Sequence, residues 1–223
     1  VPLALIFFAT ELEAHPLSHG GWLAWPLLFG AMVLSLRRLP ELDLPWFRDR
    51  YAFLLWWTAG FVASELFFLA TDQAGLAPDW GRAAAVAAVA SFLLVAVGLR
   101  HRPEWPFGVA GVVLARRGGP GLAFVLLASI TWLTLVSSGA TPPIPYLPVI
   151  NAIDLAQLLA LGACIALLQI AGPNTANSAD ANTDQADDAL RAAHRSLLIV
   201  IAFTAFLWFN GLLARTVHHY AGI

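Results

Sequence analysis

Three polar residues, Asn151, Asp154 and Gln157, follow one another at three-residue intervals where a long apolar segment begins. On an α-helix this spacing places the three side chains along one side. Polar groups in apolar surroundings are costly unless they are paired, and inside membranes ionisable ones often mark functional sites. Two interpretations follow. In one, Asn151 and Asp154 cap the helix; in the other, which is compatible with the first, the polar side contacts a ligand or completes a polar cluster.

Glu65 is a second carboxylate within apolar sequence, where it must pair, become protonated or face water. Arg215 lies at a comparable predicted depth and is followed by His218 and His219. One interpretation is a structural pair between Glu65 and either Arg215 or His218. The alternative is a proton relay, a substrate contact or metal binding. Asn210 is expected to form an interhelical hydrogen bond or to contact a ligand.

A catalytic arrangement can also be built from these residue types. His218 or His219 would then act as the general base. Glu65 or Asp154 would be its partner, and Arg215 would clamp a phosphate or carboxylate.

Near the N-terminus, His15 and His19 are four residues apart, so a helix would place both on one face. Glu11 and Glu13 precede them, and zinc binds donors of these types. Pro16 argues against a long helix here, however, and no recognised metalloprotease spacing is present. A solvated interfacial loop is therefore the alternative to a weak metal site, and no cofactor can be identified from the sequence.

The composition indicates the elements that must position these residues. Of the 223 residues, 59% are hydrophobic and 12% are charged, whereas soluble domains carry about 25% charged residues. We therefore predict an all-α, polytopic transmembrane helix bundle that forms a single domain over residues 1–223. The net charge of −2 gives no indication of nucleic acid as a partner. The apolar stretch Val1–Phe8 is too short to span and is expected to end a helix of a longer chain.

Apolar length predicts six full spans after this partial one. They are Gly21–Leu36, Tyr51–Ala70, Ala83–Leu99, Gly121–Val136, Asn151–Ile170 and Ser196–Leu213. The shorter stretch Pro106–Ala115 is predicted to lie in the interface or to re-enter the membrane. Four prolines between residues 142 and 148 exclude a regular helix before Val149.

The distribution of arginine predicts the orientation of the bundle. Residues 37–50, 100–117 and 171–195 carry ten of the twelve arginines, and short arginine-rich loops stay in the cytoplasm. In a bacterial inner (cytoplasmic) membrane, Glu11–His19 and His218–His219 would then be extracytoplasmic. Residues 171–190 lack apolar periodicity and are predicted to form a disordered cytoplasmic linker.

Three stretches of the chain resemble a known family. They are HPLSHGGWLAWP at His15–Pro26, YLPVINAIDLAQ at Tyr146–Gln157 and FLWFNGLLARTVHHYAGI at Phe206–Ile223. They are similar to the C-terminal part of the domain-of-unknown-function 2339 family, which comprises predicted multi-pass bacterial membrane proteins. This resemblance implies a longer chain with more helices, and it implies no established activity. The positions that match the family's recurrent pattern are Pro148, Asn151, Asp154, Arg215, His218 and His219.

The leading functional hypothesis is a non-enzymatic protein that binds or moves an apolar or lipid-linked envelope molecule through an outward-facing polar site. Carboxylate, histidine and asparagine side chains are predicted to gather there without a complete catalytic constellation. The alternatives are a membrane-embedded transferase or hydrolase acting at the extracytoplasmic face, and a purely structural membrane subunit. Expected partners are the lipid bilayer, an apolar or lipid-linked ligand, and either the rest of a longer chain or other membrane subunits.

Overall fold

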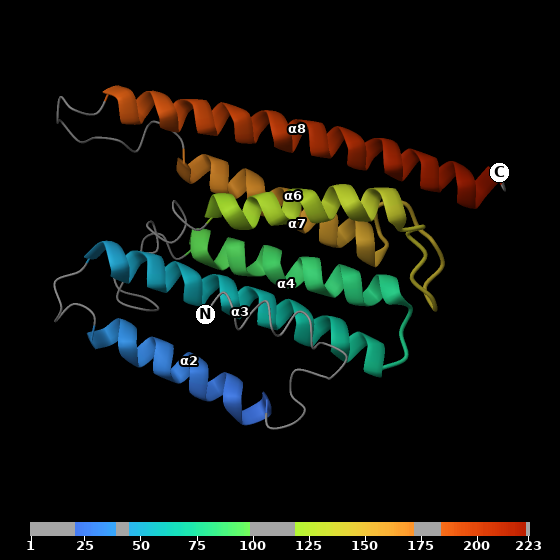
Figure 1. The fold of residues 1–223 in the computed structure, drawn as a ribbon. Coiled ribbons are helices and arrows are strands. Elements are labelled where there is room, and N and C mark those ends of the chain that lie inside the picture. The colour runs from blue at the N-terminus through green and yellow to red at the C-terminus, as the bar shows by residue number, and fades with distance from the viewer. Residues whose placement is uncertain (1–20, 39–44, 99–118, 172–183, 222–223) are drawn as a thin grey trace.

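The computed structural model describes residues 21–38, 45–98, 119–171 and 184–221, and the regular secondary structure in these residues is helical, apart from one isolated bridge in a loop. Figure 1 shows its helices lying side by side in one elongated bundle. The helices are α2 (Gly21–Arg38), α3 (Pro45–Gln73), α4 (Pro78–Gly98), α6 (Gly119–Val136), α7 (Ala152–Ala171) and α8 (Asp184–Ala221).

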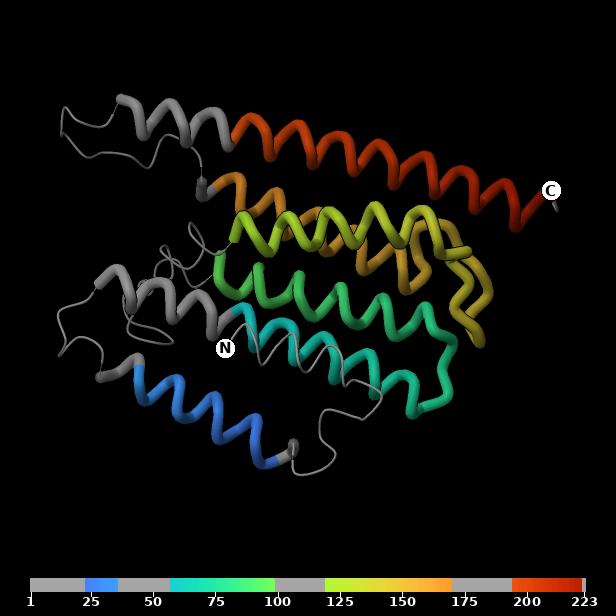
Figure 2. The backbone as a smooth tube through the Cα atoms, viewed as in Figure 1, coloured from blue at the N-terminus to red at the C-terminus, as the bar shows by residue number. Residues whose placement is uncertain are grey.

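The helices pack in layers from α2 at one side of the bundle to α8 at the other. α2 packs on α3, α3 packs on α4, and α4 packs on both α6 and α7. α8 lies on the far side, against α6 and α7 (Figure 2). Helices α3 and α8 are therefore at opposite sides of α4, α6 and α7.

Four of the described helices are long and apolar enough to cross a membrane: Pro78–Gly98, Gly119–Val136, Ala152–Gln169 and His194–Ala221. A shorter apolar stretch, Leu23–Ser35, lies in α2. The predicted helical membrane bundle is confirmed at this level, but six full spans are not. Length is one physical reason, because the apolar stretch in α2 is too short to cross the hydrocarbon core.

Small side chains form much of the interface between α4 and α7. Ala90, Ala160 and Ala163 are completely buried, and such residues allow helix axes to approach closely. The outer face of α8, by contrast, exposes large apolar side chains that include Phe203 and Phe206. A helix with this exposed face is suited to contact with lipid.

The segment between α6 and α7, residues 137–151, is irregular, as its prolines predict; we call it the proline loop. Backbone N–H groups of Ile144 and Ile150 close short turns onto the carbonyl oxygens of Thr141 and Leu147. Gly139 has a φ of 75°, a conformation that glycine adopts easily. The proline loop lies beside the N-terminal ends of α4 and α7 and the C-terminal end of α8, and we call this end of the bundle the proline-loop end (Figure 1).

Helix α8 begins at Asp184, which shortens the linker predicted for residues 171–190. Alanine, glutamine and arginine favour a helix there even though the segment lacks an apolar stripe. The rest of that linker, the stretch Pro106–Ala115 and the N-terminal stretch Val1–Phe8 lie outside the described residues.

The packing of α8 on α6 predicts that Gly211 has no room for a side chain. A Cβ atom at this position would lie 2.3 Å from the Cγ2 atom of Thr134, whose hydroxyl is held by the carbonyl oxygen of Ile130. We expect Gly211→Ala to lower the free energy of unfolding by about 1–3 kcal/mol through overpacking.

Gly162→Ala on α7 is the matched control, because a Cβ atom at Gly162 would meet no atom within 4 Å. Because alanine has a higher helix propensity than glycine, this substitution should leave the free energy of unfolding unchanged or raise it by up to about 1 kcal/mol. Thermal unfolding of both variants in detergent compares the two effects. Equal melting temperatures would contradict the packing of α8 on α6.

Candidate functional site

Asn151 is the N-cap of α7. Its Oδ1 accepts a hydrogen bond from the Asp154 backbone N–H at 2.9 Å, and its carbonyl oxygen accepts the first helical bond from Leu155. This is the geometry in which an N-cap side chain satisfies a free amide of the first turn. Asn151 also donates through Nδ2 to Oδ2 of Asp154. The capping interpretation is therefore confirmed, and it leaves Oδ1 of Asp154 for another partner.

That partner is Arg215 of α8. Its Nη2 atom lies 2.6 Å from Oδ1 of Asp154, and the two side chains are 7% and 0% exposed. The backbone N–H of Val149 donates to Oδ2 of the same carboxylate at 3.3 Å. Asp154 thus ties together the proline loop, the first turn of α7 and the end of α8. A buried pair of this kind is weak evidence for net stabilisation, but removing one partner is strongly destabilising.

Gln157 links α7 to α6 deeper in the bundle. Its Nε2 donates to the carbonyl oxygen of Ile130 at 3.1 Å and to Oγ1 of Thr134 at 3.2 Å. The side chain is completely buried. The predicted polar side of α7 therefore makes contacts within the protein at three positions in succession. We refer to the buried residues Asn151, Asp154, Gln157 and Arg215, together with the half-buried Thr134, as the buried polar cluster.

Aromatic side chains fasten the proline loop to the end of α8. The ring of Tyr146 stacks on His219, with centroids 4.2 Å apart and an interplanar angle of 16°. The hydroxyl of Tyr220 donates to the carbonyl oxygen of Tyr146 at 3.2 Å, and Nε2 of His219 lies 3.1 Å from the carbonyl oxygen of Ser138. His219 consequently holds the loop through both its ring face and its Nε2 atom.

A second polar group joins the proline loop to α4. Asp79 accepts a hydrogen bond from Arg82 at 2.8 Å and another from the Ser137 hydroxyl at 2.6 Å. The Ser137 hydroxyl in turn accepts from the backbone N–H of Gly139 at 3.0 Å. Our sequence reasoning missed this group, although an acidic residue in the first turn of a helix signals favourable dipole interactions. Nothing in the sequence pattern pointed to Ser137 as its partner.

The predicted structural pairing of Glu65 with Arg215 or His218 is wrong. Glu65 is exposed on α3, its carboxylate pairs with no described residue, and Arg215 pairs with Asp154 instead. The physical reason is the stacking order, because α4, α6 and α7 separate α3 from α8. His218 is exposed, and its ring meets the edge of His219 with centroids 5.6 Å apart.

The described contacts of Asn210 lie within its own helix. Its Nδ2 donates to the carbonyl oxygen of Phe206 at 2.8 Å, and the residue is exposed. This bond replaces the interhelical hydrogen bond that we expected. Within residues 21–38, 45–98, 119–171 and 184–221, no three His, Cys, Asp or Glu side chains form a group that could hold a metal ion. The weak metal candidates His15 and His19 lie outside the described residues.

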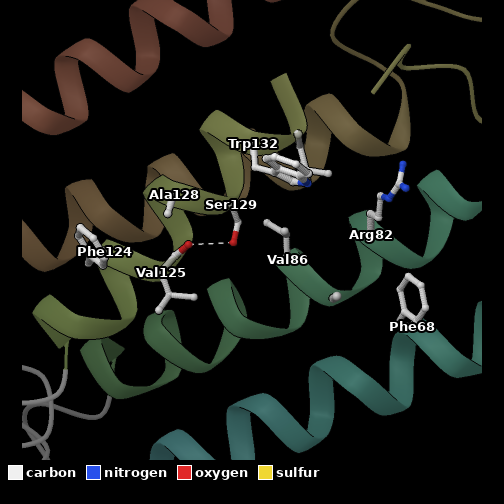
Figure 3. Close-up of a pocket in the computed structure, with 10 residues that line it drawn as sticks. Phe68, Arg82, Val86, Phe124, Val125, Ala128, Ser129 and Trp132 are labelled. Carbon is white, nitrogen blue, oxygen red and sulfur yellow. Dashed lines mark hydrogen bonds between the residues drawn. The ribbon is translucent and has the colours of Figure 1, made fainter. Parts of the chain in front are cut away.

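Apart from these polar contacts, an apolar groove lies between α4 and α6, and Figure 3 shows its lining. Its volume is about 480 Å³, which is within the usual range for small-molecule sites. Val86, Phe124 and Val125 are among the apolar side chains that line it, and Arg82 lies at its end near Phe68 (Figure 3). The groove therefore ends at a cation on the first turns of α4, at the proline-loop end.

A second groove follows the other side of α6, where α6 meets α8. Its volume is about 360 Å³, and its lining includes Leu127, Leu135 and Phe203. Trp132 belongs to both grooves and stands between them on α6. No charged residue lines this second groove.

The buried polar cluster predicts that substitution of Arg215 destabilises the protein much more than substitution of Arg82. Arg215→Gln should lower the free energy of unfolding by about 3–5 kcal/mol, because it leaves the Asp154 carboxylate buried and unpaired. The control Arg82→Gln should cost about 1 kcal/mol or less, since the Arg82 side chain is 42% exposed.

The double variant Asp154→Asn with Arg215→Gln should lose less stability than the sum of its two single variants, because no isolated charge remains. Thermal unfolding of the four proteins measures this coupling. Strict additivity, or an equal effect of Arg82→Gln, would show that the ion pair does not hold the helices together.

Comparison with known proteins identifies the family. No curated protein and no solved structure matches the chain significantly. The family model described as "Predicted membrane protein (DUF2339)" matches residues 1–223, which is the whole chain. The chain therefore belongs to the DUF2339 family of predicted membrane proteins, as the three resembling stretches predicted.

Proposed function

We propose that this integral membrane protein binds a lipid with an anionic headgroup, with an acyl chain in the α4–α6 groove and the headgroup at Arg82. One observation carries this proposal: the apolar groove on the bundle surface ends at an arginine, Arg82. Lipids combine an apolar chain with a charged headgroup in the same order.

The chemistry of the lining supports an apolar occupant. Ala85, Val86, Val125 and Ala128 line the groove between larger side chains. The hydroxyl of Ser129 is already donated to the carbonyl oxygen of Val125 at 2.8 Å, so it does not need a ligand (Figure 3). An acyl chain in this groove would leave no hydrogen-bonding group of Ser129 newly unsatisfied.

The electrostatics of Arg82 support an anionic headgroup. Its Nη1 atom is bonded to Asp79, but the side chain is 42% exposed. Arginine has five N–H donors, so the remaining donors can reach a phosphate beside the groove. Arg–phosphate contacts are charge-assisted and frequently bidentate.

The predicted orientation of the bundle in the membrane indicates which leaflet would supply the lipid. The arginine-rich segments at residues 37–50, 100–117 and 171–195 favour a cytoplasmic position for the opposite end of the bundle. Arg82 and the proline loop then lie at the extracytoplasmic surface of a bacterial inner membrane. The lipid would come from the outer leaflet, in agreement with an outward-facing site for an envelope molecule.

A purely structural subunit is the second candidate, and the buried polar cluster favours it. Asp154 and Gln157 each make contacts between helices. If these contacts were the whole purpose of the polar residues, the groove would be occupied by any bulk lipid. The two candidates therefore differ in headgroup selectivity.

The test measures lipid retention by native mass spectrometry after equal exposure to phosphatidylglycerol and phosphatidylcholine with identical acyl chains. We expect preferential retention of phosphatidylglycerol by the unmodified protein. Arg82→Gln should remove this preference, because it removes the headgroup cation while leaving the groove. Ala85→Leu should reduce retention of both lipids, because it fills the groove.

Ala202→Leu is the matched control, since Ala202 is exposed on α8 and lines neither groove. Its lipid retention should equal that of the unmodified protein. Equal retention of both lipids by the unmodified protein, or an unchanged preference in Arg82→Gln, would reject the lipid proposal and favour the structural subunit.

A further inference from the structure

The guanidinium group of Arg215 has buried donors beyond its bond to Asp154. Its Nε and Nη1 atoms are buried and have no hydrogen-bond acceptor, while Nη2 is bonded to the carboxylate. Asp154 does not serve these donors: its Oδ1 atom accepts from Nη2 alone, and its Oδ2 atom accepts from Asn151 and from the backbone of Val149. Buried donors on a charged group are expensive to leave unsatisfied.

Gln157, by contrast, has a buried acceptor without a donor. Its Nε2 atom has two acceptors, but its Oε1 atom is buried and has no donor. The same region of the bundle therefore contains unsatisfied donors on α8 and an unsatisfied acceptor on α7.

These groups belong to consecutive layers of one three-helix junction. Gly211, one turn before Arg215 on α8, lies against Thr134, and Thr134 is bonded to Gln157. Asp154, nearly one turn before Gln157 on α7, is bonded to Arg215. Asp154 and Gln157 are three residues apart on α7, a rise of about 4.5 Å, so the partner of Arg215 and the partner of Thr134 lie in neighbouring layers of the α6–α7–α8 junction.

The charge of the junction limits what can satisfy them. The Asp154–Arg215 pair is neutral as a whole, so an anionic occupant would add an uncompensated charge to a buried site, which is costly. The occupant must also donate a hydrogen bond, because Oε1 of Gln157 is an acceptor. A carboxylate ion meets neither condition, and a phosphate ion, although its P–OH group can donate, still brings the uncompensated charge.

We propose that a buried water molecule occupies the α6–α7–α8 junction, where it accepts hydrogen bonds from Nε and Nη1 of Arg215 and donates one to Oε1 of Gln157. Buried waters typically make about three hydrogen bonds to otherwise unsatisfied groups. This site is independent of the lipid groove. It would connect Thr134, Gln157, Arg215, Asp154 and Asn151 in one continuous polar network.

Water-edited solid-state NMR of the protein in lipid bilayers tests this site directly. It measures the transfer of magnetisation from water protons to the side-chain nitrogens of arginine. The Arg215 signal is assigned by its absence in Arg215→Lys. We expect the Nε signal of Arg215 to build up clearly faster than the signals of the backbone amides of Leu126 and Ala160, which are buried in the apolar core.

Gln157→Met removes the acceptor of the proposed water, so the fast build-up at Arg215 should be lost. Thr134→Val is the matched control, because it keeps Oε1 of Gln157 and the second acceptor of Nε2, the carbonyl oxygen of Ile130. The fast build-up should persist in this control. Should Gln157→Met fail to fold, the unmodified protein and Thr134→Val still decide the question.

Build-up at Arg215 that is no faster than at the core amides would overturn the proposal. Phosphorus-to-nitrogen contacts at Arg215 in the same samples would also overturn it, because they would show a lipid phosphate in place of water.

Discussion

One buried carboxylate, Asp154, sets the arrangement of the proline-loop end. A carboxylate without exposure to solvent must have partners on every side. Its partners come from three places: Asn151 at the cap of α7, the backbone of Val149 in the proline loop, and Arg215 near the end of α8. Asn151 and Val149 lie within five residues of Asp154, whereas Arg215 is 61 residues away along the chain, so the requirement to satisfy one charge brings α8 against the loop and the start of α7.

The remaining contacts of the loop depend on this anchor. Stacking of Tyr146 on His219 fixes the middle of the loop to α8, and the Ser137 hydroxyl fixes its beginning to Asp79 on α4. The same carboxylate of Asp79 holds Arg82 at the end of the apolar groove. The position of the proposed headgroup cation is therefore linked, through the proline loop, to the Asp154–Arg215 pair.

Local features could be predicted from the sequence, and partners across the bundle could not. Apolar length located six helices, and the Asn-x-x-Asp pattern located the cap at Asn151, since both depend on neighbouring residues. Similar depth made Glu65 one candidate partner for Arg215, but depth carries no information about which helices touch. The grooves beside α6 were missed for the same reason: their walls come from helices that only the packing brings together.

The α4–α6 groove, which ends at Arg82, is the lipid site that we propose in a bundle whose other polar contacts join helices. An experimental map of the protein in bilayers that contain anionic phospholipid tests it most directly. We expect continuous acyl-chain density along Val125 and Ser129, with the headgroup within hydrogen-bonding distance of Arg82. A groove filled by neighbouring side chains, or an acyl chain whose headgroup lies away from Arg82, would contradict the lipid proposal.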